Sequence, residues 1–312
     1  MITTHRLYVG IYMSERRRIY RTARNAHTSQ TIAEFFDGLG QRVFIRSELV
    51  RLIDKNREQL ALVQNASSDE VIDDFIESLP LRRFTLVSGN YTNEFHRYAW
   101  RDPDPLEVAA SIRAPKSYLC HSSALFMHKL VDHLPRELCV NYEQSDKPKP
   151  SGGLSQEALD RAFRGKQRQS AFSFRYEGLQ IVVVSGKHTG GLEVCEMPLA
   201  TGAKVRVTSF ERTLIDATVR PGYAGGVASV LDAYRRAREE LTVSRLVDTL
   251  RKLNHIYPYH QAVGFYMERA GFPAKQLAPL KALGTKWDFY LAHSIRNPAF
   301  NRQWRIHHPK GL

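Results

Sequence analysis

The chain has 312 residues, of which 43% are hydrophobic, and this length suits two folded domains better than one small one. Its formal net charge of +13 favours polyanionic partners such as nucleic acid. Three scattered cysteines argue against a disulfide framework and a structural zinc site. Since no apolar stretch reaches the ~20 residues that span a bilayer, we expect a soluble, cytoplasmic protein with no membrane partner.

Residues 1–27 are predicted to form a basic N-terminal arm. Arg16, Arg17 and Arg18 lie together there, and Glu15 is the only acid. A solvated tail and an arm that follows a DNA backbone or minor groove both fit this composition. The sequence also leaves open whether Met1 or Met13 is the true start.

Residues 28–101 show helical and strand-like patterns in the order of a winged helix-turn-helix domain. The expected elements are a helix capped by Thr28 or Ser29 (31–39), a short strand (43–45), a helix begun by Ser47, a helix from Ser67 or Ser68 to Leu79, and a hairpin formed by 84–87 and 95–100. Pro80 ends the last helix.

The proline-rich stretch 101–105 (RDPDP) predicts a boundary, after which residues 106–312 form a larger domain of mixed α and β structure. The overall class is therefore α+β. In this domain Ser122 and Ser123 are candidate helix caps. The expected strands are 171–176, 179–184, 192–197 and 204–208, the expected helices are 208–216, 227–238, 243–253, 260–270 and 275–283, and residues 303–306 form a final extended run.

The most informative part of the chain is residues 208–226, which we call the signature segment. It predicts a helix that stops at a proline turn and is followed by Gly225 and Gly226. Arg212 and Asp216 lie four residues apart on one helical face, beside an apolar run. Such a pair contributes little when exposed and specifies geometry when buried, which favours an architectural role.

Catalytic and cofactor chemistry find little support in the sequence. His121 beside Ser122 lacks a nucleophile elbow and a definable orienting acid. Residues 186–191 (GKHTGG) resemble a phosphate loop only superficially, and a hairpin turn is the favoured interpretation. We therefore expect no enzyme activity, no cofactor and no metal site.

Four segments resemble the AbiEi family, the antitoxins of type IV toxin–antitoxin and abortive-infection systems. Residues 118–125 (YLCHSSAL) are similar to that family's Y-I-S-H-x-S-A-L segment, and residues 207–216 (VTSFERTLID) to its V-T-x-x-E-R-T-L-x-D. Residues 220–226 (RPGYAGG) match R-P-x-Y-x-G-G, and residues 304–306 resemble a late W-R-L strand. The matched motif residues are Ser122, Glu211, Arg212, Thr213, Asp216, Arg220, Pro221, Gly225 and Gly226.

This resemblance implies a DNA-binding transcriptional regulator with an N-terminal winged helix. Family members repress their own operon, often at inverted repeats, and counter a toxin of the nucleotidyltransferase class in phage defence. The implied partners are double-stranded operator DNA and a cognate toxin, which need not be contacted directly. The sequence leaves a monomer and a dimer open.

The chain departs from the family where DNA would be read. The helix over residues 68–79 carries Asp69, Glu70, Asp73, Asp74 and Glu77 and no Lys or Arg, and carboxylates repel phosphates. The candidate DNA-binding residues are therefore Arg16, Arg17, Arg18, Arg46, Arg51, Lys55, Arg57, Arg82, Arg83 and Arg97. The alternative hypothesis is a protein-interaction module whose acidic helix docks a partner.

Overall fold

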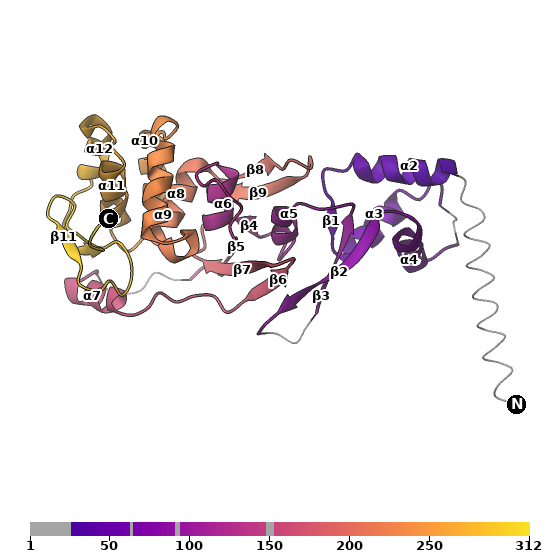
Figure 1. The fold of residues 1–312 in the computed structure, drawn as a ribbon, viewed down its shortest axis with the longest axis horizontal. Helices are drawn as coiled ribbons and strands as arrows, with labels where there is room; N and C mark the ends of the chain where they lie inside the picture. The colour runs from indigo at the N-terminus through magenta and orange to yellow at the C-terminus, as the bar shows by residue number, and fades with distance from the viewer. Residues whose placement is uncertain (1–25, 63–64, 91–93, 148–152) are drawn as a thin grey trace, which may run out of the picture. The chain divides into compact units, whose positions relative to one another are not determined.

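The computed structural model describes residues 26–62, 65–90, 94–147 and 153–312. It is a mixed α/β protein that divides into two compact units (Figure 1). We call them the N-terminal unit (residues 1–85 and 96–103) and the C-terminal unit (residues 86–95 and 104–312). No helix among the described residues is long and apolar enough to cross a membrane. Separate folding of residues 28–101 and 106–312 stays a prediction.

The described residues of the N-terminal unit form three helices, a short strand and most of a hairpin. Its elements are α2 (Ala26–Asp37), β1 (Val43–Phe44), α3 (Arg46–Lys55), α4 (Ser68–Ser78), β2 (Leu81–Ser88) and β3 (Phe95–Trp100). The strands are ordered β1–β3–β2, and β1 is antiparallel to β3 with Val43 opposite Ala99.

Aromatic residues from all parts of this unit form its core. Phe36 of α2 stacks on Trp100 at 4.7 Å between ring centroids and meets Phe75 of α4 edge-on at 5.9 Å. At the end of α2, Asp37 accepts hydrogen bonds from Trp100 Nε1 (2.8 Å) and from Arg101 Nε (2.7 Å). The bonds from Arg101 and Trp100 lower the pKa of Asp37 to about 2.

Two helices of this unit begin differently from one another. Ser67 caps α4 as predicted, since its hydroxyl accepts from Glu70 N at 3.2 Å and the Glu70 carboxylate accepts from Ser67 N at 3.0 Å. The predicted cap at Ser47 is wrong: α3 starts earlier, at Arg46, because the Glu48 carboxylate accepts from Ile45 N at 3.2 Å. α2 likewise starts before the predicted cap, at Ala26.

The far end of the β2–β3 hairpin, residues 86–95, groups with the C-terminal unit. There Val87 and Ser88 pair antiparallel with Arg175 and Phe174 of β6 (Ser173–Tyr176). Phe95 also meets the Phe174 ring at 4.9 Å. The end of the hairpin is therefore part of a sheet and not a projecting wing.

The sheet of the C-terminal unit continues from β6 in the order β6–β7–β5–β4–β9–β8. Its strands are β4 (Tyr118–Leu119), β5 (Glu137–Glu143), β7 (Leu179–Gly186), β8 (Val194–Pro198) and β9 (Lys204–Thr208). β5 and β7 are parallel, from Glu137 opposite Gln180 to Glu143 opposite Gly186. The buried run 181–184 (IVVV) in β7 is typical of a strand that is covered on both faces.

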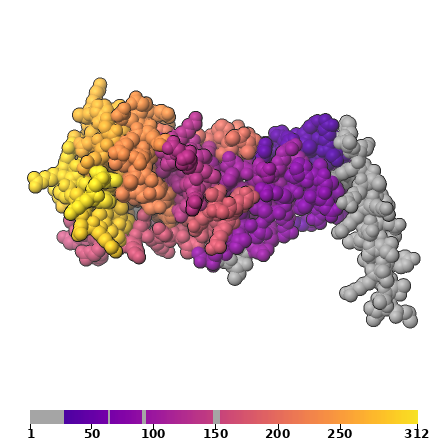
Figure 2. Space-filling model, viewed as in Figure 1, coloured from indigo at the N-terminus to yellow at the C-terminus, as the bar shows by residue number. Residues whose placement is uncertain are grey.

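Helices and a second sheet complete the C-terminal unit. The helices are α5 (Pro105–Ala110), α6 (His121–Met127), α7 (Gln156–Arg164), α8 (Phe210–Val219), α9 (Val227–Arg236), α10 (Val243–Leu253), α11 (Tyr259–Arg269) and α12 (Ala274–Lys281). The small sheet has the order β10 (Phe289–Tyr290), β12 (Ile306–His308), β11 (Ala299–Asn301). It comes from the end of the chain, drawn in yellow at the surface in Figure 2.

Trp304 anchors this small sheet to the helices. A Cβ atom on Gly264 of α11 would lie 2.2 Å from the Trp304 ring, so only glycine allows this approach. Gln261 Nε2 donates to Trp304 O at 2.7 Å. The Trp304 side chain is fully buried. The motif at residues 304–306 therefore has a role in packing.

Three predictions for the C-terminal unit are wrong. Residues 303–306 are not an extended run, because residues 302–305 form turns and β12 begins only at Ile306. Residues 186–191 do not form a hairpin turn, because β7 pairs with β5 and β6 while β8 pairs with β9. Ser122 and Ser123 do not cap α6, whose N-cap is Cys120. Their hydroxyls serve β5 instead: Ser122 Oγ donates to Glu137 O at 2.6 Å, and Ser123 Oγ accepts from Cys139 N at 2.8 Å.

Candidate nucleic-acid interface

Arg51 and Lys55 form an exposed cationic stripe on α3. They are four residues apart and lie on the helix face opposite the buried Leu49 and Ile53. Ser47 occupies the preceding turn of the same stripe and is also exposed. The row formed by Ser47, Arg51 and Lys55 contains no acidic residue. The two cations therefore face solvent on the same side of the helix.

Arg46 and Arg57, also predicted to contact DNA, already have partners inside the unit. Arg46 is paired with Asp69 of α4. Arg57 donates to Ala66 O at 2.9 Å, to Ser68 Oγ at 2.8 Å and to Asp54 Oδ1 at 3.0 Å. Arg57 therefore ties the end of α3 to the start of α4.

The three hairpin arginines differ in exposure. Arg82 and Arg83 of β2 are both exposed, and Arg82 lies 3.9 Å from the Asp102 carboxylate. Arg97 of β3 is only 7% exposed, and burial lowers its pKa. Its guanidinium donates to His96 O at 2.9 Å. The exposed cations of the hairpin are thus on β2.

A shallow depression lies beside Arg82 and contains two arginines that the sequence interpretation missed. The residues that line it are Arg42, Ile76, Leu79, Pro80, Leu81, Arg82, Arg101 and Asp102. Arg101 is held by two bonds to Asp37. Arg42 directly precedes β1 and Arg101 directly follows β3, so neither belongs to a helical charge pattern that would have drawn attention to it.

The acidic face of α4 is exposed in the structure. Asp69, Glu70, Asp73 and Glu77 are exposed, and Asp74 is half-buried. The predicted recognition helix therefore presents carboxylates to solvent. The predicted contacts at Arg16, Arg17 and Arg18 lie outside the described residues.

The charges of the signature segment are buried in the C-terminal unit. Arg212 and Asp216 are 4% and 9% exposed, and Arg212 Nε donates to Asp216 Oδ1 at 2.8 Å. Arg212 Nη1 donates to Leu192 O at 2.8 Å. Burial opposes the charged form of Arg212, but the carboxylate of Asp216 outweighs it and raises the pKa of Arg212. The pair holds α8 against the loop after β7.

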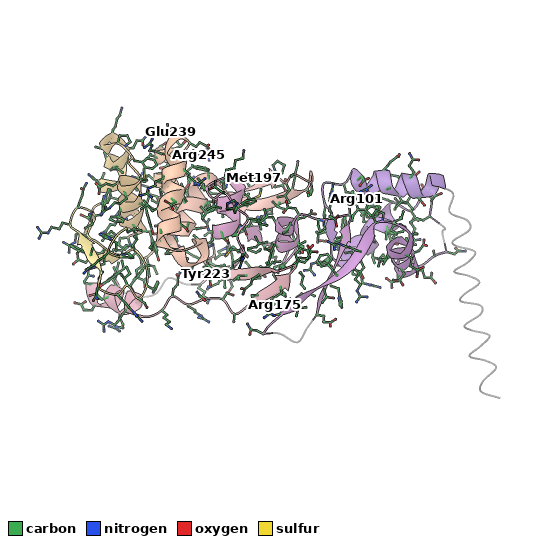
Figure 3. All side chains as sticks on the ribbon, in the orientation of Figure 1. Arg101, Arg175, Met197, Tyr223, Glu239 and Arg245 are labelled. Carbon is green, nitrogen blue, oxygen red and sulfur yellow. The ribbon has the colours of Figure 1, made fainter. Side chains whose placement is uncertain are left out.

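The remaining motif residues have structural partners or special backbone conformations. Glu211 is 3% exposed and lies 3.3 Å from Arg245 of α10, which is labelled in Figure 3. Thr213 Oγ1 lies 2.7 Å from Thr208 Oγ1. α8 ends at Val219, and the turn Pro221–Ala224 follows it. Gly225 then adopts φ 81° and Gly226 φ 93°, which L-residues rarely adopt.

The turn between α8 and α9 bonds to β7 and to the segment that precedes β6. Arg220 Nη1 donates to Ser185 O at 3.5 Å. The Tyr223 hydroxyl, labelled in Figure 3, accepts from Ser170 N at 2.6 Å. The motif thus joins α8 and α9 to the strands.

The loop after β7 is an anion nest that an internal carboxylate fills. Glu143, at the end of β5, accepts from the backbone N–H groups of Thr189 (2.8 Å), Gly190 (2.9 Å) and Gly191 (3.2 Å). Tyr118 Oη also donates to Glu143 at 2.9 Å. Burial raises the pKa of Glu143, but the bonds from Thr189, Tyr118 and Gly191 outweigh it and lower the pKa to about 2. The glycine-rich loop therefore serves a structural carboxylate.

His121 and Ser122, which invited a nucleophile interpretation, are buried, as is the neighbouring Cys120. Burial lowers the pKa of His121 to about 3 and raises the pKa of Cys120. In the described ranges, no group of His, Cys, Asp and Glu is arranged to hold a metal ion.

Comparison with known proteins yields a likeness of fold only. No protein-family model matches the chain, and no curated protein sequence matches it. The structure is similar to the crystal structure of the RV2827C protein from Mycobacterium tuberculosis, with a TM-score of 0.54 and 13% sequence identity. The match covers 91% of this chain and 92% of that one. The two chains therefore have a similar fold over nearly their whole lengths, although few of their residues are identical.

Proposed function

We propose that the protein is a DNA-binding transcriptional regulator that represses its own operon and counteracts a nucleotidyltransferase-type toxin, as AbiEi antitoxins do. The observation that carries the proposal is the N-terminal unit: a helix, strand, helix, helix, hairpin order with strand order β1–β3–β2, and exposed cations on α3 and β2. This arrangement supports a winged helix-turn-helix domain. The motif resemblance of the C-terminal unit to AbiEi proteins supports the antitoxin role.

The proposed domain holds DNA differently from a standard helix-turn-helix. Twelve residues separate α3 from α4, whereas a helix-turn-helix has a turn of about 3–4 residues. α4 is acidic, and the end of the hairpin is paired with β6. The phosphates therefore lie against Arg51 and Lys55 of α3 and Arg82 and Arg83 of β2, which position the duplex.

A mobility-shift assay on the promoter upstream of the protein's own gene tests this proposal. Wild-type protein should prefer that promoter to random DNA and lose affinity steeply as salt rises, because bound phosphates release counterions. Reversing Arg82 and Arg83 to Glu should abolish the shift, whereas Asp73→Ala and Asp74→Ala should not weaken it. Equal binding to promoter and random DNA at low salt would end the repressor hypothesis.

One observation favours a second function, a protein-interaction module of a phage-defence system. Four exposed carboxylates on α4 (Asp69, Glu70, Asp73 and Glu77) suit a basic protein surface. Co-purification with the product of an adjacent gene, lost on reversing Asp73 and Glu77 to Lys, would favour this function over DNA binding.

A further inference from the structure

Three aromatic rings lie in register across the small sheet of the C-terminal unit. Tyr290 of β10 and Phe300 of β11 both stand opposite His307 of β12. The ring centroids of Tyr290 and His307 lie 4.7 Å apart, with 22° between the ring planes. The ring centroids of Phe300 and His307 also lie 4.7 Å apart. We call Tyr290, His307 and Phe300 the ring row.

The ring row occupies the outer face of its sheet. Along β12 the side chains alternate, with Ile306 and His308 buried and His307 half-buried between them. Phe300 is 42% exposed and is one of three large hydrophobic side chains exposed among the described residues. An exposed phenylalanine beside two partly open rings offers stacking surface to a ligand.

α7 extends the row inward and gives it a rigid end. Phe163 stacks on Tyr290 at 5.7 Å with 12° between the planes and is itself buried. Ser294 N donates to Phe163 O at 2.9 Å, and Tyr290 Oη donates to Asp160 at 3.1 Å. The inner ring is therefore fixed before any ligand arrives.

The chain segments that carry the row are rich in cations. Residues 289–312 contain Arg296, Arg302, Arg305 and Lys310 but no Asp or Glu. The end of α7 and the segment after it add an exposed basic run, made of Arg161, Arg164, Lys166 and Arg168.

The carboxylates nearest the row already have partners. Asp160 accepts from Tyr290 and from Gln156 Nε2. Asp288 is paired with Arg305 at 2.8 Å. Burial lowers the pKa of His307, and its imidazole lies between the rings of Tyr290 and Phe300. The surface therefore combines stacking faces with excess positive charge.

We propose that the ring row binds single-stranded RNA, in which an unpaired base stacks on the open face of Phe300 at the edge of the row while nearby arginines and lysines hold the phosphates. Aromatic side chains on an open sheet accept unpaired bases, which a duplex keeps stacked inside. RNA is the nucleic acid that regularly presents unpaired bases in loops and ends. This surface is separate in sequence from the cations that the DNA-binding proposal uses.

Fluorescence anisotropy of the full-length protein with a labelled single-stranded RNA of about 12 nucleotides tests the proposal, since one such binding fold covers about 4–16 nucleotides. Phe300→Ala should weaken RNA binding about 5- to 150-fold, the range that loss of one base stack produces. Arg302→Glu should weaken it as well. The matched controls Val87→Ala, an apolar side chain 58% exposed, and Lys204→Glu, an exposed cation, should leave it unchanged.

Several results would overturn the proposal. They are no RNA binding by the wild-type protein, equal losses in Phe300→Ala and Val87→Ala, or tighter binding of single-stranded DNA of the same sequence. Binding of the promoter duplex by Phe300→Ala should equal wild type, so failure here is distinguishable from failure of the DNA-binding proposal. Urea denaturation of each variant identifies any that is misfolded, and Arg302→Glu then serves as the decisive variant.

Discussion

The protein places its charges in two contrasting ways. In the signature segment of the C-terminal unit, Arg212 is 4% exposed and bonded to Asp216 and Leu192. On α3 of the N-terminal unit, Arg51 and Lys55 face solvent. The segment that is most recognisable in sequence thus holds the C-terminal unit together, while exposed cations available to a partner lie in the N-terminal unit.

The largest expected effect comes from breaking the buried pair. Arg212→Met should lower the free energy of unfolding by about 3–5 kcal/mol, because Asp216 is left as an unpaired buried charge. The double variant Arg212→Met, Asp216→Leu should recover most of that loss. Urea denaturation measures both.

An exposed pair provides the control for this experiment. Arg235 and Asp232 are 2.8 Å apart with side chains 55% and 61% exposed. Arg235→Ala should cost less than about 1 kcal/mol. Equal losses from Arg212→Met and Arg235→Ala would contradict the assignment of an architectural role to the buried pair.

The next largest effect on stability is expected at Glu143, whose carboxylate accepts hydrogen bonds from three backbone N–H groups. Because its pKa is lowered from an ordinary 4.5 to about 2, its contribution to stability is full above pH 4.5 and is lost as pH falls toward 2. Glu143→Gln should cost roughly 2 kcal/mol at pH 7, since a pKa shift of one unit corresponds to about 1.4 kcal/mol and partial exposure reduces the sum.

Urea midpoints measured between pH 7 and pH 2 test the Glu143 prediction. The gap between wild type and Glu143→Gln should narrow as the pH falls below 4.5. A gap that stays constant over this range would show that the nest does not stabilise the charged carboxylate.

Reversing the exposed charges of α3 should weaken DNA binding without changing the stability of the fold. Arg51→Glu with Lys55→Glu should weaken promoter binding by about tenfold or more at moderate salt, because two phosphate contacts are lost. The free energy of unfolding should stay within about 0.5 kcal/mol of wild type, as for other surface substitutions. Anisotropy titration and urea denaturation check the two halves of this prediction.

The smallest effect is expected on α4. Asp73→Ala should change promoter affinity by less than about threefold, and in the tightening direction, because it removes a repelling carboxylate from a helix that contacts no phosphate. A clear weakening in the same titration would show that α4 accepts hydrogen bonds from DNA bases.

Local patterns in the sequence predicted the elements whose structure is set locally. α10 has the predicted bounds, 243–253, because its apolar spacing is strongly helical. Ser67, one of the two residues predicted to begin a helix, caps α4. The strands from β6 to β9 were also predicted to within a few residues.

Contacts between residues that are far apart in the sequence determine the features that local patterns did not predict. β5 was missed because its run ELCVNYE contains two glutamates and an asparagine, and its strand state depends on parallel pairing with β7. The Ser122 hydroxyl donates to Glu137 O of that strand and does not cap α6. Among the predicted DNA contacts, Arg57 and Arg97 are occupied inside the fold, which charge alone does not reveal.

The salt dependence of promoter binding tests the central claim most directly. The slope of log Kd against log salt should be shallower by about two for Arg51→Glu, Lys55→Glu than for wild type, because each lost phosphate contact removes about one released counterion. Arg235→Glu, a charge reversal in the C-terminal unit, should keep the wild-type slope. Equal slopes for wild type and the α3 variant would contradict the account and place DNA elsewhere on the protein.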